Sequence, residues 1–320
     1  MTDQAEKCAT LAALHAADEA WIIPNPWDIG SAKDLEKHGF KALATSSAAC
    51  AYTLGLKDGE VSLEQKLLYC EAMASHTTVP LSVDFEDGYD NAAAAVAANI
   101  QRLAATGVAG CSIEDFSRVD QKVFDFNHAV ERIQAAVTAV SALDMPFQLV
   151  ARADGLLRRQ YDLDEAIKRL QAFSAAGAHV LYTPGLHTME QVQQVVDNTD
   201  RPLNVLSPFF PGVAVAEFSA AGVNRLSLGD VLLTKVRTHL NESIEQMLST
   251  GAVSRAFRLS INAGYLLFDN RLISQDLKIL ANIDVCIRAH LGHDHTHQFL
   301  FRVNPGQRAI RASPVSRTFR

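Results

Sequence analysis

Short runs of apolar and β-branched residues alternate along this chain with longer, alanine-rich segments of helical character. Strands that alternate with helices run parallel, because each crossover helix returns the chain to the same end of the sheet. Eight such units favour a closed α/β architecture, the (β/α)8 TIM-type barrel. The expected strands cover residues 22–24, 42–47, 81–86, 110–115, 147–154, 179–184, 203–207 and 225–229.

Helices are expected between these strands, and three of them lead into a glycine. The glycines are Gly107, Gly177 and Gly222, and Gly is preferred just after a helix because it adopts the left-handed conformation at little cost. A doubly wound open sheet is the alternative, but no GxGxxG follows the first expected strand. The helices are expected at 92–105, 126–141, 163–176, 189–198 and 214–221.

The chain continues for roughly ninety residues beyond the last expected strand, which is more than an eighth barrel helix needs. We expect residues 1–250 to form the catalytic barrel and residues 251–291 to add C-terminal helices that make dimer or tetramer contacts. Residues 292–320 are polar and poorly periodic, so a flexible tail is expected there. The helices expected after the last strand cover 231–248, 252–267 and 272–291.

The composition argues against several classes of protein. The formal charge of −7 at pH 7 disfavours a nucleic-acid partner, which needs clustered positive charge. No apolar run approaches the roughly 20 residues that span a bilayer, and the first residues lack the order of a signal peptide. The cysteines are scattered, odd in number and without a CxxC pattern, which indicates reduced thiols. We therefore expect a cytoplasmic protein with neither a membrane nor a nucleic-acid partner.

Two patterns near the C-terminus have simple explanations. His293, His295 and His297 alternate in GHDHTH and could chelate a transition metal, but no cysteine lies near them. The basic end RVNPGQRAIRASPVSRTFR could suggest nucleic acid. A solvated segment and a loose terminus explain both patterns more simply.

Polar residues gather where the expected strands end, which is the face of a barrel that carries the active site. Asp84 and Glu86 end the third strand, and Glu114 ends the fourth. Alternation along a strand places Asp84 and Glu86 on one face, where Glu114 can join them. Clustered carboxylates need a cation, and oxygen ligands without His or Cys favour Mg²⁺ or Mn²⁺ over Zn²⁺. Asp87 and Asp115 fit the simpler role of helix caps.

Arg152, near the end of the fifth strand, is the cationic candidate. An Arg is costly to bury without an anion, and its fork suits a carboxylate or a phosphonate. A structural salt bridge to Glu114 or Asp154 is the alternative. The turn at 46–48, after the second strand, offers hydroxyls and backbone N–H groups to an anion.

Six segments carry a resemblance to a known family. They are NPWDIGSAKDLEKHGFKALATSSAACAYTLGLKDG, PLSVDFEDGYDN, GVAGCSIED, LVARAD, GAHVLYTPGL and NVLSPFFPGVAVAEFSAAGVNRLSLG. In this order, over about residues 20–235, the chain resembles the isocitrate lyase/phosphoenolpyruvate mutase superfamily, in particular its phosphonomutase-like, or carboxyphosphonoenolpyruvate phosphonomutase-like, branch. The resemblance implies a barrel whose last helix swaps between subunits of a homodimer or homotetramer. It also implies bond formation or cleavage next to a Mg²⁺-chelated pyruvate, through an enolate-like intermediate.

The resemblance also implies roles for individual acids. Asp84 is similar to the principal metal-side carboxylate, and Glu86 stands where the pattern usually has Asp. Glu114 matches the other acidic position of the metal shell. Asp58, in the loop after the second strand, matches an acid near the metal's water shell.

On the substrate side, the resemblance implies that Ser46, Ser47 and Ala48 hold the pyruvyl carboxylate, although the pattern there often has Ser-Gly-Leu. Arg152 matches the family's active-site Arg, and Asn204 is expected to line the pocket. The expected catalytic residues are therefore Arg152, Asp58 and Glu114.

One departure from the family pattern bears on the reaction. The isocitrate and methylisocitrate lyases carry a Lys-Lys/Arg-Cys-Gly-His motif on a loop after the fourth strand, whereas residues 116–123 here have FSRVDQKV and no Cys. Cys111 lies within the fourth strand and cannot replace the missing Cys. Cleavage of isocitrate-like substrates is therefore not expected, and Arg118 or Lys122 is left to act from a lid.

These observations predict a Mg²⁺-dependent enzyme that cleaves or rearranges a C–C or P–C bond of a small 2-oxo or hydroxy acid. The candidate reactions are those of a phosphonomutase, a phosphonopyruvate hydrolase, an oxaloacetate decarboxylase or a Cys-independent lyase. The alternative is a catalytically degenerate barrel that binds a small carboxylate metabolite. A Schiff-base aldolase would need a Lys at a strand end, and none of the last four expected strands contains one.

Overall fold

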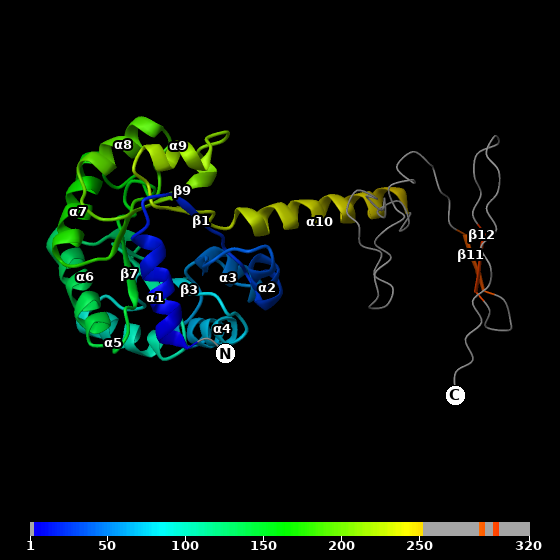
Figure 1. Cartoon of the computed structure of the whole chain (residues 1–320), viewed down its shortest axis with the longest axis horizontal. Coiled ribbons are helices and arrows are strands. Elements are labelled where there is room, and N and C mark those ends of the chain that lie inside the picture. The colour runs from blue at the N-terminus through cyan, green and yellow to red at the C-terminus, as the bar shows by residue number, and fades with distance from the viewer. Residues whose placement is uncertain (1–2, 252–287, 292–296, 301–320) are drawn as a thin grey trace. The chain divides into compact units, whose positions relative to one another are not determined.

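The computed structural model describes residues 3–251, 288–291 and 297–300. The chain divides into two compact units, Met1–Ile244 and Glu245–Arg320. The first unit contains the eight-stranded barrel (Figure 1). In the described part of the chain, no helix has both the length and the apolar character needed to cross a membrane.

Eight parallel strands form the barrel, and all eight strands predicted from the sequence are confirmed. Neighbours follow the order β1-β10-β9-β8-β7-β4-β3-β2, so strands consecutive in the chain lie side by side. The ring closes between β1 and β2, where the Ala44 N–H donates to the Pro24 carbonyl at 3.0 Å. The strands are β1 Trp21–Ile23, β2 Leu43–Ala44, β3 Leu81–Asp84, β4 Gly110–Glu114, β7 Gln148–Arg152, β8 Val180–Tyr182, β9 Leu203–Leu206 and β10 Arg225–Ser227.

Helices surround the barrel at the predicted places (Figure 1). Gly107, Gly177 and Gly222 have φ angles of 91°, 104° and 85°, which is the left-handed conformation expected after a helix. The helices are α1 Gln4–His15, α2 Ile29–Lys37, α3 Ser47–Thr53, α4 Leu63–Ser75, α5 Ala93–Ala104, α6 Phe126–Ser141, α7 Leu163–Ala175, α8 Met189–Asp197, 3-10 helix η1 Ser207–Phe209, α9 Val215–Ala220 and α10 Val231–Thr250.

The core lies between the helices and the strands. On α5 the buried side chains Val96, Ile100 and Leu103 recur at helical spacing and face the sheet. Every residue of β4 is buried, as expected for a parallel strand that is covered on both faces. Gly110 begins β4 where a Cβ atom would lie 2.6 Å from the Gln148 carbonyl oxygen, so only Gly permits this approach.

Helix α1 covers the end of the barrel at which the strands begin. Lys7 Nζ donates to the carbonyls of Ala74 and Thr77 at 3.1 and 2.7 Å. At the other end of α1, His15 Nε2 lies 3.2 Å from Arg225 Nη1, and His15 Nδ1 lies 3.1 Å from Gln148 Oε1. Because Arg225 is always a donor, Nε2 accepts and Nδ1 donates, which keeps the imidazole neutral. Burial, with the Arg225 charge, lowers the pKa of His15 to about 3.

The second unit is described only in part. Arg288–Leu291 (β11) pairs antiparallel with His297–Leu300 (β12). The helix expected at 272–291 is therefore wrong for its last four residues, because they pair their backbone with β12 instead of forming helical hydrogen bonds. The helix expected at 252–267, residues 272–287 and most of the tail lie outside the described residues, as do His293 and His295.

The His15 cluster makes the stability of the barrel depend on pH. His15 is neutral when folded but accepts a proton near pH 6.5 when unfolded, so acid favours the unfolded state. We expect this group to cost roughly 1.4 kcal/mol for each pH unit below about 6.5. Above that pH, the neutral His15 carries no such cost and the barrel keeps its full stability with respect to this group. Urea unfolding between pH 7.5 and 4.5 should show a shallower fall in the free energy of unfolding for His15→Gln than for the unchanged protein; equal slopes would contradict this assignment.

Candidate active site

The ends of three neighbouring strands bring the main predicted residues together. Glu114 ends β4 and lies beside Arg152, which ends β7. Arg152 Nη1 lies 3.2 Å from Glu114 Oε2 and 3.6 Å from Asp84 Oδ1, at the end of β3. The predicted clustering of Asp84, Glu114 and Arg152 therefore follows from the parallel order of β3, β4 and β7.

Arg152 also forms a salt bridge with Asp154, which is the alternative, structural role expected for its side chain. Its Nε and Nη2 both donate to Asp154, with an Nη2–Oδ2 distance of 3.0 Å. Asp154 is completely buried, whereas the Arg152 side chain keeps 13% of its surface exposed. One edge of the guanidinium is thus fixed by Asp154, and the Nη1 side faces Glu114 and Asp84.

Asp84 is held in its ionised form. Burial opposes its charge, but Arg152, Lys66 and the N–H groups of Ser47 and Glu86 together lower the pKa of Asp84 below its ordinary value. The Ser47 N–H donates to Asp84 Oδ2 at 3.0 Å. The segment expected to hold a substrate carboxylate is the first turn of α3, where Ser46 caps the helix. In this turn Ser47 contacts Asp84, a predicted metal ligand.

Glu86 reaches the site by a route that strand alternation does not describe. Strand β3 ends at Asp84, and Glu86 has a left-handed φ of 49°, so the prediction that both share one strand face is wrong. Glu86 is nevertheless buried, and its Oε1 accepts a hydrogen bond from the Tyr89 hydroxyl at 2.7 Å. Tyr89 is also left-handed, with φ of 65°. Such residues cost of order 1–3 kcal/mol each, so surrounding contacts must hold this turn.

The pKa of Glu114 shifts in the opposite direction to that of Asp84. Burial raises the pKa of Glu114 well above its ordinary value, although the Arg152 charge acts in the other direction. Asp154 and Asp84 add further repulsion to the ionised form. The carboxyl group therefore either holds a proton or needs a further cation.

Lys66, on α4, was missed by the sequence analysis. Its side chain is completely buried, and its Nζ has no hydrogen-bond partner within the described residues. Burial opposes its charge, but Cys50, Cys70 and the acids Asp84 and Glu86 raise the pKa of Lys66. The sequence feature that could have identified Lys66 is its position on the apolar face of the helix, one turn before Cys70, because a Lys is unusual there.

Arg118 ties three loops together instead of serving as a free lid residue. It lies in the hairpin formed by β5 Phe116–Ser117 and β6 Lys122–Val123. Its Nη1 donates to the carbonyls of Gly59 and Val61 at 3.2 and 2.8 Å. Its Nε lies 3.3 Å from Asp87 Oδ1, and its guanidinium stacks 4.2 Å from the centre of the Tyr89 ring. Arg118 thereby supports the turn that carries Glu86.

Two predicted residues do not join this cluster. Asp58 is exposed in the loop between α3 and α4. Asn204 is fully buried, donates to Ser227 Oγ at 3.0 Å and accepts from Arg225 Nε at 2.8 Å. Within the part of the chain that the structure describes, no hydrogen bond links either residue to Arg152 or to the clustered acids. Asn204 belongs instead to a polar network that leads toward His15.

The donor chemistry of the cluster fits a hard divalent cation. Asp84, Glu86 and Glu114 offer only oxygen atoms, and a bound cation would oppose the effect of burial on the charge of Glu114. Among the described residues, no group of three or more His, Cys, Asp or Glu side chains is positioned to hold a metal ion by itself. Mg²⁺ usually keeps several waters and takes one or two carboxylates, so an open arrangement suits it.

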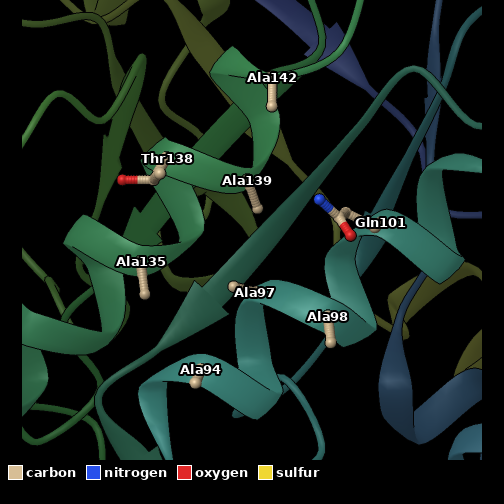
Figure 2. A pocket seen from close by; sticks show the side chains of 8 residues that line it. All are labelled: Ala94, Ala97, Ala98, Gln101, Ala135, Thr138, Ala139 and Ala142. Carbon is tan, nitrogen blue, oxygen red and sulfur yellow. The ribbon is translucent and has the colours of Figure 1, made fainter.

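A groove between α5 and α6 lies on the outer surface, apart from this cluster. Figure 2 shows its lining of small side chains, with Gln101 and Thr138 as the polar members. The groove offers no titratable group to a substrate, so we do not assign it a catalytic role. Its lining residues are Ala94, Ala97, Ala98, Gln101, Ala135, Thr138, Ala139 and Ala142.

Comparison with known proteins points to one family. The family model described as phosphoenolpyruvate phosphomutase matches residues 11–248. The 2-methylisocitrate lyase of Escherichia coli K12 is 30% identical over 177 residues, which are 52% of this chain and 58% of that protein.

Two solved structures show the same fold. One comes from Burkholderia cenocepacia J2315 and carries only the general designation of lyase/mutase. It has a TM-score of 0.75 at 36% identity and covers 78% of this chain and 91% of its own. The other is oxaloacetate acetylhydrolase in complex with its product oxalate. It has a TM-score of 0.72 at 26% identity, with 79% and 90% coverage.

The Arg118 contacts predict a measurable loss of stability. Replacement by Met leaves the buried Asp87 carboxylate without its charged partner, which should cost about 3 kcal/mol in the free energy of unfolding. Arg102→Met is the matched control, because it breaks an exposed pair with Glu64 and should cost less than about 1 kcal/mol. Denaturant unfolding measures both variants. Similar losses for the two would show that Arg118 is not a structural tie.

Proposed function

Because the chain belongs to the phosphoenolpyruvate mutase family, we propose that it is a magnesium-dependent enzyme acting on a small 2-oxo or hydroxy acid. This family is part of the isocitrate lyase/phosphoenolpyruvate mutase superfamily, a group of lyases and mutases. The reaction cleaves or rearranges a C–C or P–C bond through an enolate-like intermediate. The observation that carries this proposal is the convergence of Asp84, Glu114 and Arg152 at the ends of neighbouring strands. Residues 1–250 would form the catalytic domain.

Asp84, Glu86 and Glu114 are the proposed metal ligands, with Mg²⁺ as the expected ion and Mn²⁺ as a substitute. When bound there, the metal would polarise a substrate oxygen and offset the negative charge that develops beside it. The ionised Asp84 is ready to bind a cation, and a bound cation would favour the ionised form of Glu114, which burial opposes.

Arg152 would bind the anionic group of the substrate. Its Nη1 now faces Glu114 and Asp84, and a substrate carboxylate or phosphonate could take their place beside it. Asp154 keeps the other edge of the guanidinium fixed, so little conformational freedom is lost on binding. The N-terminal turn of α3, with Ser46, Ser47 and Ala48, lies next to Asp84 through Ser47 and would hold the substrate's carboxylate end.

Glu114 is the proposed acid–base group. Burial raises its pKa and favours the protonated carboxyl group without a bound cation, so cation binding or a change in the charge of the substrate would release this proton. Asp58 would act only if its exposed loop approaches the cluster, and Asn204 would act through its polar network with Arg225. Both remain proposals from the family pattern.

The hairpin after β4 favours a second candidate function, a degenerate barrel that binds a small carboxylate metabolite. Residues 116–123 lack the lyase Cys, and Arg118 is engaged by Gly59, Val61 and Asp87. The retained acids and Arg152 favour turnover instead. A metal-dependent rate decides between the two functions.

We propose that the protein assembles as a homodimer or homotetramer through α10. Val236, Leu240, Ile244 and Leu248 recur at four-residue intervals along this helix, and each has more than a third of its surface exposed. The part of α10 up to Ile244 extends from the barrel instead of covering β10 (Figure 1). An apolar stripe of this kind is stabilised when a second helix surface covers it.

The catalytic proposal predicts pyruvate release from one member of a panel of oxaloacetate, phosphonopyruvate, methylisocitrate and dimethylmalate. Release should require Mg²⁺ and stop with EDTA. Asp84→Asn should lower the rate at least about a hundredfold, since it removes a metal-side charge, and Asp197→Asn, at the end of α8, should leave it unchanged. An undiminished rate for Asp84→Asn would exclude the proposed site. No pyruvate from any member of the panel, and no phosphoenolpyruvate from phosphonopyruvate, with the protein folded and metal-loaded would favour the binding function.

The assembly proposal predicts that charge on the α10 stripe separates the subunits. Leu240→Asp together with Ile244→Asp should shift the sedimentation coefficient from that of a dimer or tetramer toward that of a monomer. Leu68→Asp on α4 is the control, because Leu68 is also exposed but lies outside the stripe. A monomeric starting protein, or an unchanged coefficient for the double variant, would refute assembly through α10.

A further inference from the structure

Arg225 is a buried cation that the proposed reaction does not use. It is the first residue of β10, and only 4% of its surface is exposed. Its Nη1 lies 3.2 Å from Nε2 of His15, on the α1 helix that covers the end of the barrel where the strands begin. Arg225 therefore contacts α1 and not the acids of the candidate active site.

Arg225 differs from the other deeply buried arginines because it has no acidic partner. Arg169 pairs with the Asp115 carboxylate at 3.0 Å, and Arg132 donates to three carbonyl oxygens of the turn at 87–91. Among the described residues, no carboxylate lies within ion-pair distance of Arg225. A buried charge without a counter-ion is costly, so this cluster lacks a negative group.

The hydrogen-bond partners of Arg225 are neutral. Nε donates to Asn204 Oδ1 at 2.8 Å, and Nη1 donates to the unprotonated Nε2 of His15. His179 and the Arg225 charge both lower the pKa of His15, so the charged groups that act on His15 are basic. Burial lowers the pKa of Arg225 to about 10, which leaves it charged at neutral pH. These contacts satisfy donors without neutralising the charge.

Two donors in this cluster have no acceptor in the part of the chain that the structure describes. Arg225 Nη2 makes no hydrogen bond, and it is not one of the buried nitrogen atoms that have neither a partner nor accessible surface. A small accessible space therefore adjoins Nη2. Trp21 Nε1 is buried without a partner. Trp21 pairs with Arg225 in register, and its ring centre lies 5.7 Å from that of His15.

The size and the charge of this space indicate the kind of ligand. Water would accept a hydrogen bond from Nη2 but would leave the positive charge without compensation. Arg225 and His15 keep only 4% and 3% of their surfaces accessible, which leaves no room for an organic acid or a phosphate ester. A monovalent ion of nearly the size of water satisfies both the donor and the charge.

We propose that Arg225 binds a small monovalent anion of the chloride class at the α1 end of the barrel, where the anion supplies the negative charge that the chain lacks. His15, Asn204 and Arg225 connect this site to α1, β9 and β10. The inference does not depend on the proposed function. An anion that binds only the folded state stabilises the barrel in proportion to its occupancy.

Urea unfolding at pH 7.5 tests the site with two salts at equal sodium concentration. Chloride fits the space, whereas gluconate is too large for it. Relative to gluconate, 0.2 M chloride should lower the equilibrium constant of unfolding at least about threefold, the effect of a ligand present at about twice its Kd. Equal stability in the two salts would overturn the proposal.

Asn204→Asp is the informative variant, because it places a carboxylate where Asn204 Oδ1 now lies 2.8 Å from Arg225 Nε. The chain then carries its own counter-ion, so the difference between chloride and gluconate should disappear. Arg201→Met is the control, since Arg201 is an exposed arginine just before β9, and it should keep the difference. A threefold chloride effect that persists in Asn204→Asp would show that chloride acts elsewhere.

Diffraction from crystals of the unchanged protein grown with sodium bromide locates the ion directly and does not depend on how a variant folds. An anomalous peak within hydrogen-bond distance of Arg225 Nη2 is the expected result. Bromide found only on the outer surface, or a water molecule at Nη2, would show that the barrel tolerates the buried charge without a counter-ion and would overturn the proposal.

Discussion

The arrangement of charge around Arg152 is the interaction on which the candidate site depends. A single guanidinium contacts Asp84, Glu114 and Asp154, which come from the ends of three neighbouring strands. Each of these charged groups is costly to bury alone. Removal of one would leave a buried charge without its oppositely charged partner. The cluster therefore couples the chemistry of the mouth to the closure of the barrel, because only a closed parallel ring places these strand ends together.

The surrounding residues divide the work of supporting this buried charge. Lys66 approaches Asp84 and Glu86 from α4, and its Nζ has no hydrogen-bond partner in the described residues. Arg118 supports the strained turn from the hairpin after β4, through Tyr89 and Asp87. Positive charge thus comes to the acids from helix, hairpin and strand. The hairpin that a lyase would use for its catalytic Cys is used here as a structural tie.

The polar strand ends could be predicted because strand order and side-chain chemistry are local properties of the sequence. Asp84, Glu114 and Arg152 end expected strands, and parallel strands end at one face. Alternation failed for Glu86, since the strand stopped two residues earlier and a left-handed turn redirected the side chain. Asn204 was expected at the pocket, but its neighbours Ser227 and Arg225 hold it within the barrel.

By itself, the sequence determined the eight strands, their order, and the acids and Arg at their ends. These features follow from periodicity, glycine placement and residue type, which act over a few residues. Only the tertiary structure decided that Lys66 faces the acids, that Arg118 ties three loops, and that Arg158 shares Asp154 with Arg152. These partners are far apart in the chain or lie on irregular loops. Their contacts depend on burial and on packing between elements, which no local pattern records.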